Sequence, residues 1–165
     1  MKATRFFALV SAALLAATAA NAGQPQVVLS VDVKEEISAP DAQGRPGVVR
    51  KKVERTGPGD ILVYTLTYTN FGNEPAVSAT VDDPIPAGTV ILPASVLGER
   101  ASITFSADNG RSFAPYPLMK TVTGVDGKPA TIEAAPDSYT HVRFSAADPI
   151  APGESRSASF KVIVR

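Results

Sequence analysis

Few residues of this chain could carry out catalysis. The sequence contains no cysteine and one histidine, His141, which excludes thiol nucleophiles and thiolate metal sites. A serine hydrolase needs a nucleophile on a sharp turn, such as Gly-x-Ser-x-Gly, and that motif does not occur. His141 alternates with Val142 and Phe144, so we expect it on the opposite, solvent-facing side of a strand. We predict that the protein is not an enzyme and has no catalytic or cofactor-binding residue.

Two adjacent carboxylates, Asp82 and Asp83, are candidates for acid–base catalysis or for binding a metal ion. Consecutive strand residues point to opposite faces, so the pair is poorly placed as a general acid and base. A calcium site shared with Asn70, Asp60 or Asn73 is an alternative, because loops at one end of a sheet can gather oxygen ligands. The Asp-Asp-Pro spacing lacks the alternating acidic pattern of a self-contained calcium loop. Turn capping is the expected role, and we predict no metal ligand.

A turn motif follows in SADNGRSF, residues 106–113. It matches the Asp-box pattern Ser-x-Asp-x-Gly-x-Ser-Phe known from sialidase-like propellers. We expect Asp108 to accept backbone hydrogen bonds, Gly110 to take a positive φ, and Phe113 to pack under the hairpin. Propellers repeat the motif in each blade, whereas here it occurs once. It therefore predicts a well-formed hairpin and not sialidase chemistry.

The hairpin begins an insert that spans about residues 107–138. It contains a second hairpin signal, Asp126-Gly127, and it exceeds what a domain of about 100 residues needs. Long inserts often carry the function that distinguishes one domain from its relatives. An exposed contact patch could form there, or the loop could fold back onto the sheet. The candidate patch residues are Tyr116, Leu118, Met119 and Tyr139.

Short alternating segments must position all of these residues. Apolar side chains recur at every second position in several runs, which is typical of half-buried strands. No run after residue 23 sustains helical spacing, and the 14 prolines and 12 glycines mostly separate the runs. The rows expected to face the core are Val27, Leu29, Val31 and Val33; Leu62, Tyr64, Leu66 and Tyr68; Val77, Ala79 and Val81; Ile103 and Phe105; Val142 and Phe144; and Ala158, Phe160, Val162 and Val164.

The number and spacing of these runs predict an all-β fold. We expect an immunoglobulin-like, two-sheet β-sandwich of about seven to nine strands over residues 23–165. Residues 1–22 are predicted to be a secretory signal peptide. Lys2 and Arg5 precede an apolar run that ends in Ala20-Asn21-Ala22, a small-x-small cleavage pattern. The run is shorter than the roughly 20 residues of a membrane span, so we expect no integral membrane segment after cleavage.

Charge excludes nucleic acid as a natural partner. Taking Lys2 and Arg5 from the 16 basic residues leaves 14, against 16 acidic residues, a net charge of about −2. Such a balance gives no long-range attraction to phosphate. The one basic cluster, Arg50, Lys51, Lys52 and Arg55, is expected to be a solvated strand face and turn, because valines interrupt it and no aromatic residue accompanies it.

Two stretches carry a family resemblance. PGDILVYTLTYTNFGNEPAVSATVDDPIPAGTVI (residues 58–91) and IAPGESRSASFKVIVR (residues 150–165) resemble the DUF11 family, a bacterial immunoglobulin-like domain usually repeated in surface and envelope proteins. The resemblance implies a sandwich fold, an envelope or extracellular setting, and no catalytic residues. This chain differs from many members of the family, because it contains one copy of the domain and not several. The resemblance also implies a structural role for the first stretch: Asn70 caps the turn, Gly72 supplies a positive φ, and Asn73 hydrogen-bonds its own backbone.

These observations favour an exported, non-catalytic module, periplasmic or at the cell surface. It would interact with an envelope protein or surface polymer, or form part of the bacterial cell envelope. The first strand (Val27–Val33) or the last (Ala158–Val164) could recruit a partner by adding a strand to a sheet edge. A secreted module that binds calcium or carbohydrate is the alternative.

Overall fold

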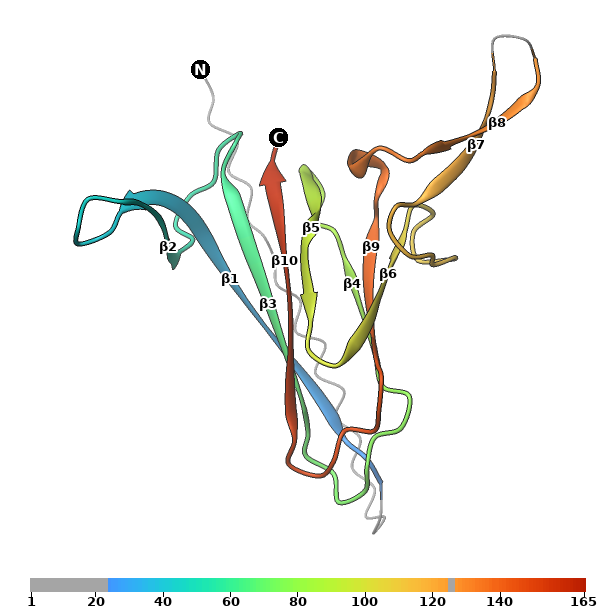
Figure 1. Ribbon diagram of the computed structural model, residues 1–165. Coiled ribbons are helices and arrows are strands. Elements are labelled where there is room, and N and C mark those ends of the chain that lie inside the picture. Colours follow the sequence, from blue (N-terminus) through green and yellow to red (C-terminus); the bar gives the residue numbers. More distant parts are fainter. Residues whose placement is uncertain (1–23, 125–126) are drawn as a thin grey trace.

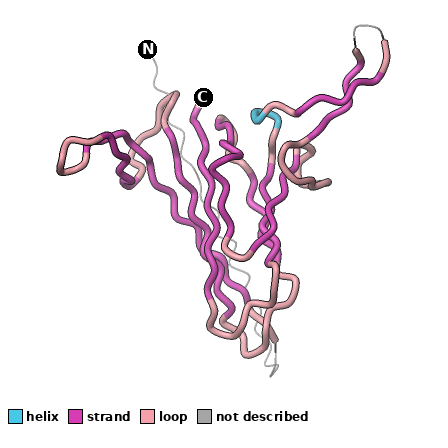
Figure 2. The backbone as a smooth tube through the Cα atoms, viewed as in Figure 1, coloured by secondary structure: helices cyan, strands magenta, loops and turns pink. Residues whose placement is uncertain are grey.

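The computed structural model describes residues 24–124 and 127–165, and these residues form an all-β fold (Figure 1). The predicted signal peptide, residues 1–22, lies outside them. The strands are β1 (Val27–Pro40), β2 (Pro46–Lys52), β3 (Ile61–Asn70), β4 (Thr80–Pro84), β5 (Thr89–Gly98), β6 (Ala101–Ser106), β7 (Met119–Thr123), β8 (Pro129–Glu133), β9 (His141–Ala146) and β10 (Ser155–Val164). One 3₁₀ turn, η1 (Pro136–Ser138), is the short helix drawn in cyan in Figure 2. Within the described residues, no helix has the length and apolar character needed to cross a membrane.

Two antiparallel sheets enclose the core. The larger has five strands in the order β2-β1-β3-β10-β5, and the smaller has three in the order β4-β9-β6. Their eight strands form a β-sandwich arrangement, within the predicted number. A third sheet consists of β7 and β8 alone. Figure 1 shows this hairpin projecting to one side of the molecule, while the β1–β2 hairpin projects to the other.

The core confirms the alternation expected for β3, β9 and β10. Leu66 of β3, Val142 of β9 and Phe160 of β10 are fully buried. Tyr64 stacks on Phe160 with ring centroids 5.0 Å apart. Each large apolar side chain buried in this way contributes about 1.5–3 kcal/mol. The sandwich is therefore held mainly by the facing rows of its central strands, because the chain has no disulfide to add.

Two expected core rows are wrong in part. Val27, Leu29 and Val31 of β1 remain 37–44% exposed, and Val77, which lies in the loop before β4, is 71% exposed. The three-stranded sheet is narrower than the five-stranded sheet that it faces. Strand β1 contacts chiefly its sheet neighbours β2 and β3, so no other strand among residues 24–124 and 127–165 covers the first part of its inner face. Only Val33 of this row packs against the core.

The last strand is not an edge. β10 lies between β3 and β5 and is hydrogen-bonded to both. The prediction that Ala158–Val164 could add a partner strand is therefore wrong, because both sides of its backbone are already used. The first strand differs: β2 pairs with it only from Lys34 to Pro40.

Asn70 fixes the chain reversal after β3. Its side chain is completely buried. Its Oδ1 accepts hydrogen bonds from the backbone N–H groups of Gln26 and Gly72, each at 3.0 Å. Its Nδ2 donates to the carbonyl oxygens of Glu74 and Ile150, at 2.7 and 2.9 Å. The predicted capping role is thus confirmed, and the same amide also joins this turn to the segments before β1 and β10.

Gly72 has a different role from the one predicted. It is not among the glycines with positive φ. Instead, the N-terminal segment crosses directly over it: a Cβ at this position would lie 2.3 Å from the carbonyl oxygen of Gln24 and 2.5 Å from the nitrogen of Gln26. Glycine is required because two backbones approach closely, which is the other reason that chains use it. No hydrogen bond ties Asn73 to its own backbone in the manner expected.

A buried arginine fixes the same end of the sandwich. Arg156 of β10 is 1% exposed. It donates to Glu154 Oε1 at 2.8 Å and to the carbonyl oxygens of Asp148 and Pro149, at 3.1 and 2.8 Å. A buried guanidinium is tolerated only when its donors are satisfied in this way. It therefore holds the loop before β10 against the core.

Candidate functional site

The histidine and the Asp-box motif form a structural turn. Asp108 Oδ1 accepts hydrogen bonds from the backbone N–H groups of Arg111 and Ser112, at 3.1 and 2.9 Å. The hydroxyls of Ser112 and Ser106 also donate to its carboxylate, and these hydrogen bonds lower the pKa of Asp108. Asn109 and Gly110 both have positive φ, 60° and 77°, as expected for such a turn. The motif builds the loop and leaves no free acid.

His141 belongs to that loop's support. A Cβ at Gly110 would lie 3.6 Å from the imidazole ring of His141. Its Nδ1 lies 3.2 Å from Thr140 Oγ1, and the same hydroxyl accepts the backbone N–H of Asn109 at 3.0 Å. Phe113 lies in the loop between β6 and β7, with the guanidinium carbon of Arg143 of β9 3.6 Å from its ring centroid. Phe113 therefore packs beneath an arginine side chain.

Asp82 and Asp83 point to opposite faces, as the strand rule requires. The carboxylate of Asp82 receives two hydrogen bonds from Arg143, from Nε at 2.6 Å and from Nη2 at 2.7 Å. Asp83 is half-buried instead, and its Oδ2 has no hydrogen-bond partner among the described residues. Burial raises the pKa of Asp83 to about 6. Burial also raises the pKa of Tyr64, and the negative charge of Asp83 raises it further.

The candidate calcium ligands do not form a cluster. Asp82 is engaged by Arg143, Asn70 is committed to four hydrogen bonds, and Asp60 accepts the backbone N–H of Gly57 at 2.7 Å. Residues 24–124 and 127–165 contain no group of three or more His, Asp or Glu side chains that could hold a metal ion. Nothing in this part of the chain gathers the candidate oxygen ligands in one place.

The insert divides the proposed contact patch. Leu118 and Tyr139 are buried, and the Leu118 N–H donates to the Tyr139 hydroxyl at 3.0 Å. Tyr116 and Met119 are more than half exposed. The insert therefore folds back at its base, while β7 and β8 extend away as a two-stranded hairpin (Figure 1). Asp126 of the predicted turn lies outside the described residues, and Gly127 has the positive φ of 76° expected of it.

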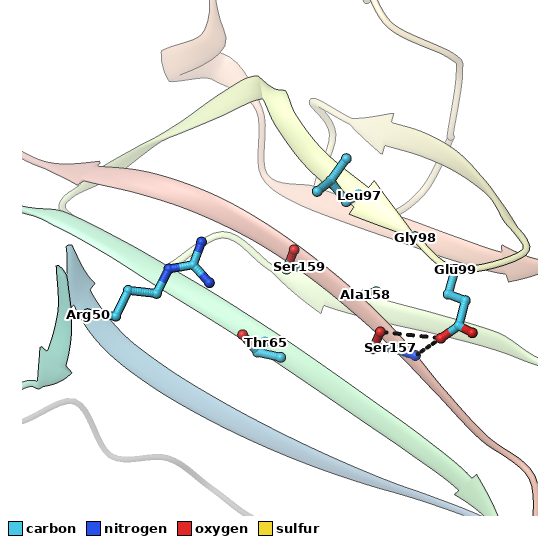
Figure 3. Close-up of a pocket in the computed structure, with 8 residues that line it drawn as sticks. All are labelled: Arg50, Thr65, Leu97, Gly98, Glu99, Ser157, Ala158 and Ser159. Carbon is cyan, nitrogen blue, oxygen red and sulfur yellow. Dashed lines mark hydrogen bonds between the residues drawn. The ribbon is translucent and has the colours of Figure 1, made fainter. Parts of the chain in front are cut away.

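The outer face of the large sheet carries a shallow groove. It has a volume of about 430 Å³. Figure 3 shows Arg50 and Leu97 on opposite sides of it, with Thr65 and Ser159 between them. Glu99 closes one end, where it accepts hydrogen bonds from the N–H and hydroxyl of Ser157, at 3.3 and 3.4 Å. None of the eight lining residues is aromatic.

Arg50, Lys51 and Lys52 of the basic cluster lie on β2 beside this groove, and Arg55 lies in the loop that follows. Arg50 Nε is 3.5 Å from Glu36 Oε2, and Lys51 Nζ is 3.4 Å from Glu35 Oε2. Lys161 of β10 also contacts Glu36, at 2.5 Å, and this pair lowers the pKa of Glu36. All four cations of the cluster are exposed, as predicted, and carboxylates of β1 match two of them, Arg50 and Lys51.

We define the free edge as residues Val27–Val33 of β1, the part of this strand that has a neighbour on one side only. On one side it pairs with β3 without interruption. On the other side β2 begins only opposite Lys34, so no described strand pairs with it there.

The hydrogen-bonding direction of each free-edge residue follows from its neighbours. Gln26 directs its carbonyl toward the β3 side, because that oxygen accepts the N–H of Phe71 at 2.7 Å. Direction alternates along an antiparallel strand, so Val28, Ser30 and Asp32 also face β3. The four residues Val27, Leu29, Val31 and Val33 therefore present their N–H and C=O groups away from the sheet. An unpaired row of this kind is a template for another strand.

Three other sheet edges, those formed by β2, β4 and β5, carry features that discourage pairing. β2 contains Pro46 and three consecutive cations, β4 has only five residues and ends in Pro84, and β5 contains Pro93 and a bulge in its pairing with β10. Charges, prolines and bulges are the usual protections of an edge. The free edge has no proline or bulge and a single charged residue, Asp32, and four of its seven residues are exposed apolar side chains, Val27, Val28, Leu29 and Val31.

Sequence reasoning named this strand as a candidate edge but placed its valines in the core. A signal was available: Val27-Val28-Leu29 is a run of three apolar residues, so it presents apolar side chains on both faces of the strand. A strand that is apolar on both faces and lies outside the core is suited to bind a partner after the domain has folded.

Comparison of this chain with protein-family models, with curated protein sequences and with solved structures found no match in any of the three.

Proposed function

We propose that this protein is an exported, non-catalytic module with a DUF11-type, immunoglobulin-like fold, which acts in the bacterial cell envelope by adding a partner strand to its free edge. The observation that carries the proposal is the coincidence of unpaired backbone and exposed apolar side chains over Val27–Val33. Main-chain hydrogen bonds supply affinity in such contacts, and alternate side chains supply specificity. Residues 1–22, with their basic start, apolar run and Ala-Asn-Ala ending, support export.

The test combines localisation with an edge variant. A full-length chain with a C-terminal tag is produced in a bacterial host, and medium, periplasm and membranes are separated and crosslinked before purification. We expect a crosslinked species of higher mass outside the cytoplasm. Leu29→Lys should abolish it, because a lysine on the edge opposes strand addition, whereas Val77→Lys, at an exposed apolar residue of another loop, should not. Equal crosslinking of both variants and the parent chain, or retention in the cytoplasm, would refute the proposal.

A carbohydrate-binding role is the second candidate, and the groove of Figure 3 favours it. Three hydroxyl side chains, Thr65, Ser157 and Ser159, line it together with Arg50 and Glu99, and such groups can hydrogen-bond to sugar hydroxyls. Sugar binding here would act without aromatic stacking. Thermal melting in the presence of cell-wall oligosaccharides tests it: a ligand of the folded state raises the melting temperature with concentration. An unchanged melting temperature at millimolar oligosaccharide would exclude this role.

A further inference from the structure

The free edge is complementary to itself. We propose that it pairs with the same edge of a second copy of this chain, antiparallel, with Ser30 on the two-fold axis. This inference rests on the proposed function, since it names the occupant of the same edge. A two-fold contact uses one patch twice, so every residue must suit the residue related to it by the axis. The backbone hydrogen bonds and the apolar row of Val27–Val33 meet that condition, and the proposed register places no like charges opposite each other.

The hydrogen-bonding directions fit this register. With Ser30 opposite Ser30, Leu29 lies opposite Val31 of the second copy, and Val27 lies opposite Val33. These four residues are the ones whose N–H and C=O groups point away from β3. Antiparallel strands pair through residues that both face the partner. The register therefore uses every outward backbone group of the free edge, and the two five-stranded sheets become continuous.

The side chains fit as well. Residues opposite each other in an antiparallel pair lie on the same face, so Val27, Leu29, Val31 and Val33 of one copy extend the same row of the other. On the opposite face, Asp32 lies across from Val28. A register with Asp32 on the axis would instead place two carboxylates opposite each other, which is destabilising. Asp32 is already matched within its own chain by Lys34, at 3.2 Å.

The length of the contact sets its strength. Pairing is limited to seven residues, because the strand begins at Val27 and β2 occupies the position opposite Lys34. An edge of that length is a small interface, which is typical of weak and transient contacts. We therefore expect a dimer that forms at protein concentrations on the order of tens of micromolar, as in a crowded or membrane-confined compartment.

Single cysteines test the register directly, because the natural chain contains none. Ser30→Cys would place two thiols at a non-hydrogen-bonded pair on the axis, where Cα atoms are about 4.5 Å apart, within the range that disulfides bridge. Val28→Cys is the matched control on the same face of the same strand. Its equivalents in two copies would be four residues apart along the strands, about 13 Å. A mixture of Val28→Cys and Asp32→Cys should crosslink again, because these positions oppose each other.

The expected result is that oxidised Ser30→Cys, and the Val28→Cys and Asp32→Cys mixture, form covalent dimers at least tenfold faster than Val28→Cys alone. All three residues are exposed, and thermal melting of each variant would confirm that the fold is kept. Sedimentation velocity of the cysteine-free chain gives a second measurement. Dimers should increase with concentration in the parent chain and in Val77→Lys, and should be absent in Leu29→Lys.

The outcomes separate the two proposals. Equal crosslinking rates for Ser30→Cys and Val28→Cys would overturn the register. A chain that stays monomeric at several hundred micromolar would overturn self-pairing. If Leu29→Lys nevertheless removed the crosslinked species found in cells, the free edge would still be the binding surface, with a different protein as its occupant. If Leu29→Lys changed neither measurement, the proposed function would fail as well.

Discussion

Asp83 should make the protein less stable at neutral pH than in mild acid. Its carboxyl lies on the inner face of β4, and burial raises its pKa from 3.8 to about 6. The folded state therefore binds a proton more tightly than the unfolded chain does. The stability associated with the neutral carboxyl is fully present below pH 3.8, and it is lost as the pH rises through about 6.

The magnitude follows from the same values. One pKa unit corresponds to about 1.4 kcal/mol, so a rise from 3.8 to about 6 sets an upper limit of about 3 kcal/mol. Solvent reaches part of the side chain, which weakens the penalty, and we expect about 1–2 kcal/mol. Asp83→Asn removes the charge while keeping the shape. At pH 7.5 this variant should be more stable than the parent chain by that amount, and at pH 3.5 the two should be equal.

The assay is urea unfolding of both chains between pH 3.5 and 8, followed by intrinsic tyrosine fluorescence or circular dichroism. Glu36 and Glu154 have lowered pKa values, so their contributions to the free energy of unfolding are lost in acid. Both chains contain these two residues, so the difference between their free energies of unfolding reports on Asp83 alone. Asp82→Asn is the matched control on the opposite face. It loses the ion pair with Arg143 and should be destabilised by up to about 1 kcal/mol. A constant difference between Asp83→Asn and the parent chain at all pH values would refute the reasoning.

Two further predictions concern the turn after β3. Gly72→Ala should reduce the free energy of unfolding by about 2–4 kcal/mol, because its methyl group would overlap the backbone of Gln24 and Gln26. Gly57→Ala, whose methyl group would make only an ordinary contact with Asp60 Oδ2 at 3.8 Å, should change it by less than about 1 kcal/mol. Similar values for both variants would contradict the close approach at Gly72. Asn70→Ala removes four hydrogen bonds from buried groups and should cost about 3 kcal/mol or more. Its neighbour Asn73 is exposed, so a comparable loss for Asn73→Ala in the same denaturant titration would show that the effect is not specific to the buried amide.

Alternation predicted well wherever two strands with apolar rows face each other. The rows of β3 and β10 were correct to the residue, since a strand's two faces follow directly from its backbone geometry. The same reasoning placed Val27, Leu29 and Val31 in the core, where they are not. Alternation shows which side chains share a face. It cannot show whether a second sheet is wide enough to cover that face, because coverage depends on strands far away in the sequence.

Strand order was the second limit. The last strand of a chain is often at an edge, yet β10 is central, because β5 pairs with its outer side. The Gly72 prediction failed for a related reason. A turn motif indicates that glycine is needed, but local sequence does not distinguish a positive φ from a close approach by residues 24–26. Strand alternation correctly predicted that Asp83 and Asp82 point to opposite faces. It could not predict the raised pKa of Asp83, because that depends on burial between the packed sheets.

Amide hydrogen exchange along the free edge is the most direct test of the central claim that this edge is the binding surface. In the dilute monomer, the amides of Val28, Ser30 and Asp32, which bond to β3, should exchange slowly, and those of Leu29 and Val31 should exchange rapidly. In the crosslinked complex recovered from cells, the Leu29 and Val31 amides should become at least tenfold slower. Rapid exchange of both amides in that complex would contradict the account, because a paired edge must protect them.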